Sequence, residues 1–316
     1  MSHFKKGDLI PIHDDAETIL IVEEHIGSGS QADVYRVWDR TDNQHVAMKH
    51  CFGYFANDKS KYHKKIQIMI KHEAPHHRLC WPLKVGRMTS DQCFVFTMPL
   101  LDGYRPLTGL VTNQDDATIE QKVQVIYQTA QVIQALQKQG FVFGDISDRN
   151  ILYRLEADGS VDVRFIDSES LSLGKSLTLG LQGSGKFRAP ELLLPDPNRD
   201  DGRPERPSTQ SDLHALYTLS FQLLLRRHPL DGAQSRTRRS DDYEGFLEFY
   251  ARNPRFIFDG NSNEPGEHVR KKWEALPQPM QIFFRWAFRQ EALKNKYERP
   301  SCTEFIRCLK LSYDYI

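Results

Sequence analysis

Polar side chains that suit phosphate or metal binding recur in short motifs along this chain. Lys49 ends one apolar segment, Asp145 and Asn150 lie five residues apart, and Asp167 follows a second apolar segment. A lysine ammonium is a compact charge suited to phosphate oxygens. Carboxylate and amide oxygens suit a hard cation such as Mg2+. The residue types therefore fit the chemistry of a metal-bound phosphate.

A glycine-rich segment, Gly27-Ser28-Gly29-Ser30, lies between two apolar segments that have the composition of strands. Backbone N–H groups of such a turn can surround phosphate oxygens. A glycine-rich turn is weak support by itself, because any β-hairpin can carry glycines. Its position ahead of Lys49 makes a phosphate site the interpretation to test.

The segment His72-Glu-Ala-Pro-His76 has the H-E-x-x-H pattern of zinc peptidases. That chemistry requires both imidazoles on one face of an unbroken helix. Pro75 interrupts a helix and disfavours helical backbone at the residue before it. We therefore interpret this motif as the end of a helix and expect no zinc.

A second motif, Gly180 to Phe187, nearly fits the phosphate-binding pattern G-x-x-x-x-G-K-[ST]. Phe187 replaces the hydroxyl residue that would bind Mg2+ in that pattern. Pro190 would also disrupt the helix that must follow the loop. We therefore expect no P-loop here.

The elements that would position these motifs change character along the chain. The apolar segments are short, β-branched and aromatic up to about residue 98, which predicts strands, and they have helical spacing beyond about residue 116. This order predicts an α+β fold with a β-rich first part. The predicted strands are 18–22, 34–38, 45–48, 81–83 and 93–98, the predicted helices are 59–72, 119–139, 210–227, 277–293 and 301–312, and the predicted long loops are 195–208 and 231–276.

The composition is that of a globular protein, with 316 residues of which 39% are hydrophobic and 27% charged. Basic and acidic residues are equal in number, at 42 each, which argues against a general nucleic-acid binder. The cysteines form no C-x-x-C pair, so we expect neither a disulfide framework nor a cysteine zinc site. The sequence contains no pattern of a signal peptide or membrane span, which favours a cytoplasmic protein.

Taken in order, the motifs resemble the signature set of the protein kinase superfamily from about residue 18 to 312. They are the glycine loop, Val46-Ala-Met-Lys49, the segment from Phe143 to Asn150, Phe165-Ile-Asp167, and Ala189-Pro-Glu191. The resemblance implies a bilobal fold. Its parts would be a lead-in over 1–17, an N-lobe over 18–98, a hinge over 99–104 and a mainly helical C-lobe over 105–316.

The resemblance also implies roles in Mg-ATP binding and phosphoryl transfer. Lys49 would hold the α- and β-phosphates, and Asp145 would orient the substrate hydroxyl and accept its proton. Asn150 and Asp167 would bind Mg2+, or Mn2+ in its place. The other nucleotide contacts would be Gly27, Ser28, Gly29 and Ser30 over the phosphates, Val34, Ala47 and Leu152 around adenine, and Met98, Pro99 and Leu101 at the hinge.

Two further residues resemble structural groups of the family. Asp212 corresponds to a buried carboxylate that anchors the catalytic loop, and Arg299 corresponds to the partner of the A-P-E glutamate, here Glu191. A bidentate Arg–carboxylate pair at that place would be a strong charge-assisted interaction.

The catalytic motifs depart from the family pattern at several positions. Gly144 replaces the arginine of H-R-D, which implies that activation-loop phosphorylation is not the main control. Ser147 replaces a catalytic-loop lysine, and Ser168-Glu169 replace the Phe-Gly of D-F-G.

The helix glutamate that should pair with Lys49 is not identified by the sequence. Glu73 is the only glutamate between Lys49 and Glu120, and it lies beside the helix-ending proline. The facing position on the helix is then Lys65, Ile66 or Gln67.

The leading interpretation is an active Mg-ATP-dependent protein kinase that phosphorylates Ser and Thr. Gly183-Ser184 matches the Gly-Thr of the Ser/Thr kinase substrate loop. The alternative is a pseudokinase, a nucleotide-binding scaffold or regulator of a partner phosphatase. The lost Phe-Gly and the missing helix glutamate favour this alternative, whereas the four retained polar residues oppose it.

The segments 144–150, 166–170 and 276–288 are similar to two kinds of bacterial kinase. One kind carries helix-hairpin-helix tails, and the other occurs with von Willebrand A-type and PPM-type phosphatase proteins. The resemblance therefore implies a protein substrate and partners of those types. The basic segment 235–239 is interpreted as a solvated loop rather than a nucleic-acid site, because acidic residues follow it.

Overall fold

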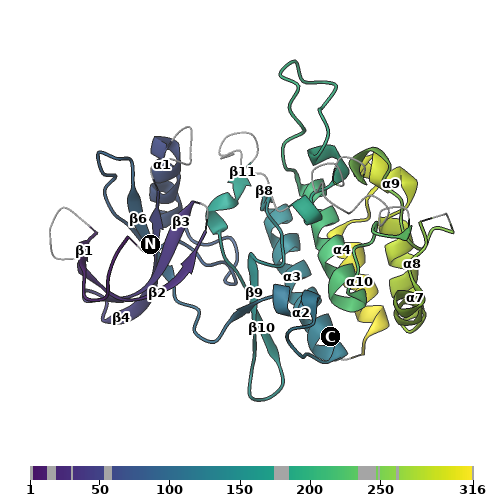
Figure 1. Ribbon diagram of the computed structural model, residues 1–316, viewed down its shortest axis with the longest axis horizontal. Helices are drawn as coiled ribbons and strands as arrows, with labels where there is room; N and C mark the ends of the chain where they lie inside the picture. Colours follow the sequence, from purple (N-terminus) through teal and green to yellow (C-terminus); the bar gives the residue numbers. More distant parts are fainter. Residues whose placement is uncertain are drawn as a thin grey trace. The chain divides into compact units, whose positions relative to one another are not determined.

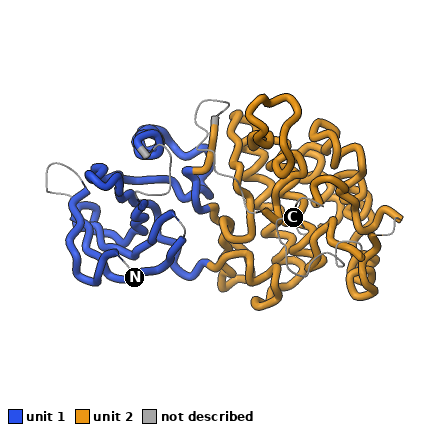
Figure 2. Tube along the Cα trace, turned by 45° about the horizontal axis from the view of Figure 1, so that its top comes forward, with its two compact units in different colours: residues 1–104, 166–169 blue, residues 105–165, 170–316 orange. Residues whose placement is uncertain are grey.

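The computed structural model describes residues 3–12, 19–29, 31–52, 59–173, 185–233, 247, 250–260 and 263–314. The chain divides into two compact units, which Figure 2 colours separately. Unit 1 comprises residues 1–104 and 166–169, and unit 2 comprises residues 105–165 and 170–316. Residues 166–169 therefore belong to unit 1, although the chain on both sides of them belongs to unit 2.

Unit 1 is built on a six-stranded antiparallel sheet with the order β1-β2-β3-β4-β6-β5. Buried and less buried residues alternate along β3, which is the period-2 pattern of a strand with one face in the core. The strands are β1 (Leu9–Pro11), β2 (Ile19–Ser28), β3 (Ala32–Asp39), β4 (Gln44–Cys51), β5 (Lys84–Val85) and β6 (Phe94–Pro99).

One face of this sheet carries the hydrophobic core of unit 1. The core residues Leu20, Val22, Tyr35, Val37, Val46, Met48 and Val95 come from the central strands, and Ile12 joins them from beyond β1. The helix α1 (Lys59–Ile70) buries Ile66 and Met69. The Trp81 indole donates to the carbonyls of Met69 and His72 at 2.9 Å, and so satisfies carbonyls at the end of this helix.

Three sequence predictions in unit 1 need correction. Residues 9–11, predicted within a loose lead-in, form the edge strand β1 because Leu9 to Pro11 pair with Ile19 to Ile21 of β2. Residues 81–83 are not a strand, and the short β5 begins at Lys84 instead. The helix predicted over 59–72 ends at Ile70, which is consistent with the proline that follows.

Unit 2 is mainly helical, and Figure 1 shows α3, α4 and α10 side by side in it. The hairpin of β9 and β10 pairs with β7, and β8 pairs with β11. The helices are α2 (Thr108–Thr112), α3 (Ile119–Lys138), α4 (Thr209–Leu225), α7 (Glu267–Glu274), α8 (Gln278–Ala287), α9 (Gln290–Lys294) and α10 (Cys302–Ser312). The strands are β7 (Arg105–Pro106), β8 (Phe141–Val142), β9 (Ile151–Leu155), β10 (Val161–Phe165) and β11 (Ser172–Leu173).

Helix starts in unit 2 are specified by local capping. Thr118, Ser208 and Ser301 each form a capping box at the start of α3, α4 and α10, which satisfies two backbone N–H groups reciprocally. Nearly every residue of α4 is buried, as expected for a helix in the centre of a domain. The helix α10 packs against α3, where the Gln134 amide donates to the Thr303 hydroxyl at 2.9 Å.

Two predictions in unit 2 were incomplete. The helix α7 lies within the predicted loop 231–276, where Val269 and Trp273 are buried four residues apart on an otherwise charged helix. The helix predicted over 277–293 is two helices, α8 and α9, which are separated at Phe288 and Arg289. The chain leaves the helical conformation at Arg289, which has extended backbone at the start of α9.

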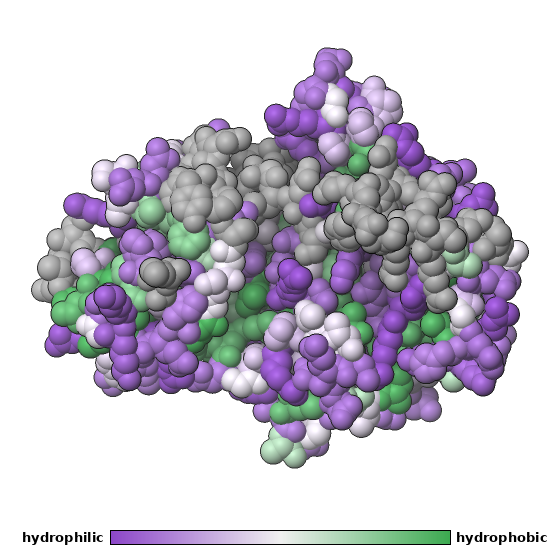
Figure 3. All heavy atoms as spheres, in the orientation of Figure 1, coloured by the Kyte–Doolittle hydropathy of each residue, from purple (hydrophilic) through white to green (hydrophobic). Residues whose placement is uncertain are grey.

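Hydrophilic residues predominate on the face drawn in Figure 3. The large hydrophobic side chains that are exposed, such as Leu9, Ile282 and Leu311, are far apart in the sequence. No helix in the described ranges is both long enough and apolar enough to span a membrane.

Candidate functional site

The glycine-rich segment forms the turn between β2 and β3 of unit 1. The Gly29 N–H donates to the Ala32 carbonyl at 2.8 Å, and Gly27 lies opposite Val34 in the sheet. The Ser28 hydroxyl donates to the buried Asp33 carboxylate at 2.7 Å, so this side chain stabilises the turn itself. Ser30, also predicted to contact phosphate, lies outside the described residues.

The predicted adenine contacts of unit 1 share one face of the sheet with Lys49. Val34 lies opposite Lys49, and Ala47 lies opposite Met98. Residues two apart on a strand point to the same side, so Ala47 and Lys49 point away from the core residue Met48. Pro99 and Leu101, the other predicted hinge contacts, follow Met98 within unit 1.

Lys49 forms two ion pairs with residues that follow β10. Its Nζ lies 2.7 Å from Asp167 Oδ1 and 2.5 Å from Glu169 Oε1. Burial by itself would lower the pKa of Lys49, but the charges of Glu169 and Asp167 outweigh it and raise this pKa. Lys49 is therefore a cation held by two carboxylates.

Glu169 is a site residue that no sequence motif assigns. It replaces the glycine of the D-F-G motif, yet its side chain contacts Lys49 and is only 5% exposed. Among the candidates on α1, Lys65 faces this carboxylate-bearing segment, and its Nζ donates to the Glu169 carbonyl at 2.6 Å. Glu73 lies beyond the end of α1 and is exposed.

In unit 2, Asp145 and Asn150 are held together by direct contacts. The Asn150 amide nitrogen donates to Asp145 Oδ2 at 2.8 Å and to the Asp145 carbonyl at 3.0 Å. The Asn150 N–H donates to the buried Ser147 hydroxyl at 3.3 Å, so Ser147 stabilises the turn itself. Leu152, predicted to contact adenine, follows on β9.

Asp212 anchors this loop from α4, as its motif predicts. Its two carboxylate oxygens accept the N–H groups of Phe143 at 2.7 Å and Gly144 at 2.9 Å. Burial raises the pKa of Asp212 to about 7, the two N–H donors oppose the rise, and the nearby Asp145 charge adds to it. Gly144 has a φ of 78°, a left-handed conformation that glycine adopts without strain.

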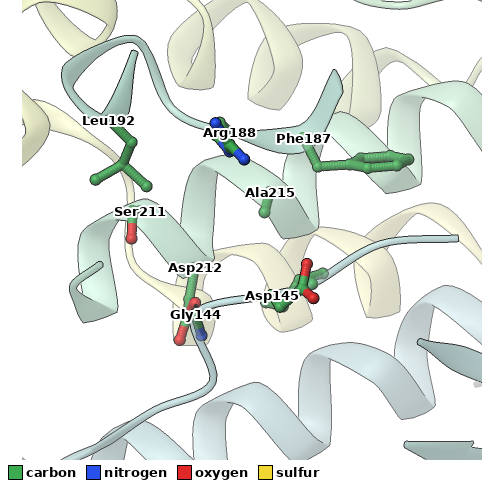
Figure 4. A pocket seen from close by; sticks show the side chains of 9 residues that line it. Gly144, Asp145, Phe187, Arg188, Leu192, Ser211, Asp212 and Ala215 are labelled. Carbon is green, nitrogen blue, oxygen red and sulfur yellow. Dashed lines mark hydrogen bonds between the residues drawn. The ribbon is translucent and has the colours of Figure 1, made fainter. Parts of the chain in front are cut away.

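A hollow in unit 2 borders Asp145, and Figure 4 shows its lining side chains. Gly144 and Asp145 lie along one side of the view, and Phe187, Arg188 and Leu192 lie along the opposite side. The residues Ser211, Asp212 and Ala215 of α4 lie between them. Asp145 is thus adjacent to the segment that leads into Ala189-Pro-Glu191.

That segment is held by the predicted pair of Glu191 and Arg299. The Arg299 guanidinium donates to both carboxylate oxygens of Glu191, at 2.7 and 2.6 Å. It also donates to the carbonyls of Gln210 and Ala292. The pair is bidentate, which is the strong geometry for this interaction.

A buried histidine also supports the segment. The His214 ring on α4 contacts the Tyr250 hydroxyl at 3.0 Å, and that hydroxyl donates to the Arg188 carbonyl at 3.3 Å. Burial lowers the pKa of His214 well below its ordinary value, and the charge of Arg299 adds to the effect. His214 is therefore neutral in the folded protein at neutral pH.

This neutrality predicts that acid destabilises the protein partly through His214. The unfolded histidine takes up a proton below about pH 6.5 while the folded one does not, so stability is lost as pH falls through that value. We expect His214→Gln to reduce the loss between pH 6.5 and 5 by about 2 kcal/mol. Denaturant unfolding at a series of pH values measures the slope. His268→Gln, at an exposed position of α7, is the control, and equal slopes for wild type and His214→Gln would contradict the prediction.

The structure describes the whole H-E-x-x-H motif but only part of the segment from Gly180 to Phe187. His72 and His76 lie beyond Ile70, where α1 ends, so they are not on a helix. Gly180 to Ser184 lie outside the described residues, as does the Gly183-Ser184 pair, while Gly185–Phe187 form a short 3-10 helix.

Comparison with protein families supports the same conclusion as the geometry. The model of the protein kinase domain matches residues 20–309. The chain therefore belongs to the protein kinase family, and its fold is the bilobal α+β fold with a β-rich N-lobe and a mainly helical C-lobe. No curated protein matches the chain significantly. The family defines a phosphotransferase class that uses ATP with a divalent metal and acts on protein substrates.

Proposed function

We propose that this protein is a Mg-ATP-dependent kinase that transfers the γ-phosphate to Ser and Thr hydroxyls of a protein substrate. The observation that carries the proposal is the retention of four polar groups in a protein kinase domain. Lys49 is paired with Asp167 in one unit, and Asn150 is paired with Asp145 in the other. A scaffold that only binds a partner has no need of all four.

The donor groups fit a hard divalent cation. Asp167 offers a carboxylate, of which Oδ1 accepts from Lys49. Asn150 uses its amide nitrogen toward Asp145, which directs its carbonyl oxygen elsewhere. Carboxylate and amide oxygens are the ligands that Mg2+ prefers. When bound, the metal would neutralise charge on the phosphates of ATP.

The protein's own groups would then supply positioning and proton transfer. Asp145 would orient the substrate hydroxyl and accept its proton, and Asn150 holds the Asp145 carboxylate for that role. Lys49 would neutralise phosphate charge, and the β2–β3 turn would offer backbone N–H groups. Gly144 in place of an arginine supports a kinase that is not controlled mainly by activation-loop phosphorylation.

The same resemblance supports narrower proposals about context. Segments 144–150 and 166–170 favour a bacterial-type kinase. Its partners would be a von Willebrand A-type protein and a PPM-type phosphatase.

The first test is phosphoryl transfer to three peptides that are identical except for one Ser, Thr or Tyr acceptor. With Mg-ATP, we expect phosphate on the Ser and Thr peptides and faster transfer to them than to Tyr. Intact-mass measurement of the protein detects autophosphorylation in the same samples. Stabilisation by Mg-ATP with no transfer to any acceptor would instead support the pseudokinase.

A further inference from the structure

The counter-ion of Lys49 is supplied by an unexpected part of the chain. In this protein α1 contains no acidic residue between Lys59 and Ile70. The carboxylate that meets Lys49 comes from Glu169, in the segment 166–169 that follows β10. Glu169 is 4% exposed, so its charge is compensated by protein groups rather than by water.

The helix contributes donors to this carboxylate-bearing residue. The Tyr62 hydroxyl donates to Glu169 Oε1 at 3.1 Å, which is also the oxygen nearest to Lys49 Nζ. Lys65 is 3% exposed, and its Nζ donates to the Glu169 carbonyl at 2.6 Å. The side chain and the backbone of Glu169 are therefore both fixed by α1.

The contacts form a continuous network from α1 to the sheet. Lys65 and Tyr62 hold Glu169, Glu169 holds Lys49, and Lys49 also contacts Asp167. Asp167 has a φ of 58°, an unusual value for a residue other than glycine. This left-handed residue changes the direction of the backbone two residues before Glu169, whose side chain then contacts Lys49.

We propose that Glu169 is the positioning residue of Lys49, and that Lys65 and Tyr62 of α1 position Glu169 in turn. In the family pattern, the helix provides a glutamate that pairs with the strand lysine. Here the helix provides the cation Lys65, and the segment after β10 provides the carboxylate of Glu169. The inference rests on the proposed nucleotide site, in which Lys49 contacts the phosphates.

Glu169→Gln tests the proposal because it removes the charge but retains the shape of the side chain. We expect it to lower kcat/KM for ATP about 100-fold, the cost of misplacing a positioned group, and to weaken Mg-ATP binding measured by calorimetry. Glu169→Asp should give an intermediate loss, and it also serves if the glutamine variant does not fold. Lys65→Met should weaken binding, whereas Lys64→Met, an exposed neighbour on the same helix, should not.

A double-mutant cycle separates positioning from general stability. If Glu169 acts through Lys49, adding Glu169→Gln to Lys49→Met should weaken Mg-ATP binding no further. Additive losses, or wild-type affinity in Glu169→Gln, would overturn the inference. Binding is measured independently of transfer, so a wild type that binds Mg-ATP without transferring phosphate would contradict the proposed kinase activity alone. The cycle would still decide the role of Glu169.

Discussion

Replacing Asp145 by Asn is expected to lower the rate of phosphoryl transfer by about 10²- to 10⁴-fold, the range for loss of a general base. The substitution removes the group that would accept the proton of the substrate hydroxyl. It retains the size of the side chain, whose Oδ2 contacts the Asn150 amide at 2.8 Å. Mg-ATP affinity should be nearly unchanged, because Asp145 is assigned to the substrate and not to the nucleotide.

Initial rates with labelled ATP and calorimetric nucleotide binding measure the two quantities. Asp158→Asn is the matched control, since Asp158 is an exposed carboxylate in the turn between β9 and β10. A wild-type rate in Asp145→Asn would remove this residue from the mechanism. Equal losses in both variants would indicate a general effect of the substitution.

The second large effect is expected on stability, from Arg299→Met. The Arg299 side chain is 1% exposed and that of Glu191 is 14% exposed. Removing the guanidinium leaves the largely buried carboxylate of Glu191, the buried carbonyl of Ala292 and the partly buried carbonyl of Gln210 without this donor. Breaking one partner of a buried pair costs about 3–5 kcal/mol, and we expect that loss in the free energy of unfolding.

Urea unfolding of the variants measures the change directly. Arg270→Met is a suitable control, because Arg270 pairs with Glu264 at the surface with a side chain that is 48% exposed. Exposed pairs contribute about 0–1 kcal/mol. The double variant Glu191→Gln/Arg299→Met should be more stable than the sum of its single variants predicts. A loss for Arg299→Met as small as that for Arg270→Met would contradict the assignment.

Much of the site could be predicted because its residues are specified by short local spacings. Asp145 and Asn150 lie in one turn, and Lys49 shares a strand with Ala47. The partner roles of Asp212 and Arg299 were also predicted from their motifs, and both contacts are present. A fixed local spacing can be recognised in a sequence, whereas contacts that depend on the course of the backbone between distant residues cannot.

Glu169 is a site residue that local spacing in the sequence could not predict. Its contact with Lys49 joins positions 120 residues apart, and it depends on the left-handed backbone at Asp167. Neither feature has a pattern that periodicity can detect. The helix α7 was missed for a different reason, since only Val269 and Trp273 among its residues are buried, and its composition is that of a loop.

The packing of α10 against α3 has a consequence for synthesis on the ribosome. Thr303 and Cys302 contact Gln134 and Ala130, which are 169 and 172 residues earlier in the chain. During translation, α3 is therefore made long before the helix that covers it. Domains fold as units, and long-range contacts slow this step. Until α10 has emerged from the exit tunnel, the face of α3 that it covers stays exposed, and this exposed surface favours aggregation.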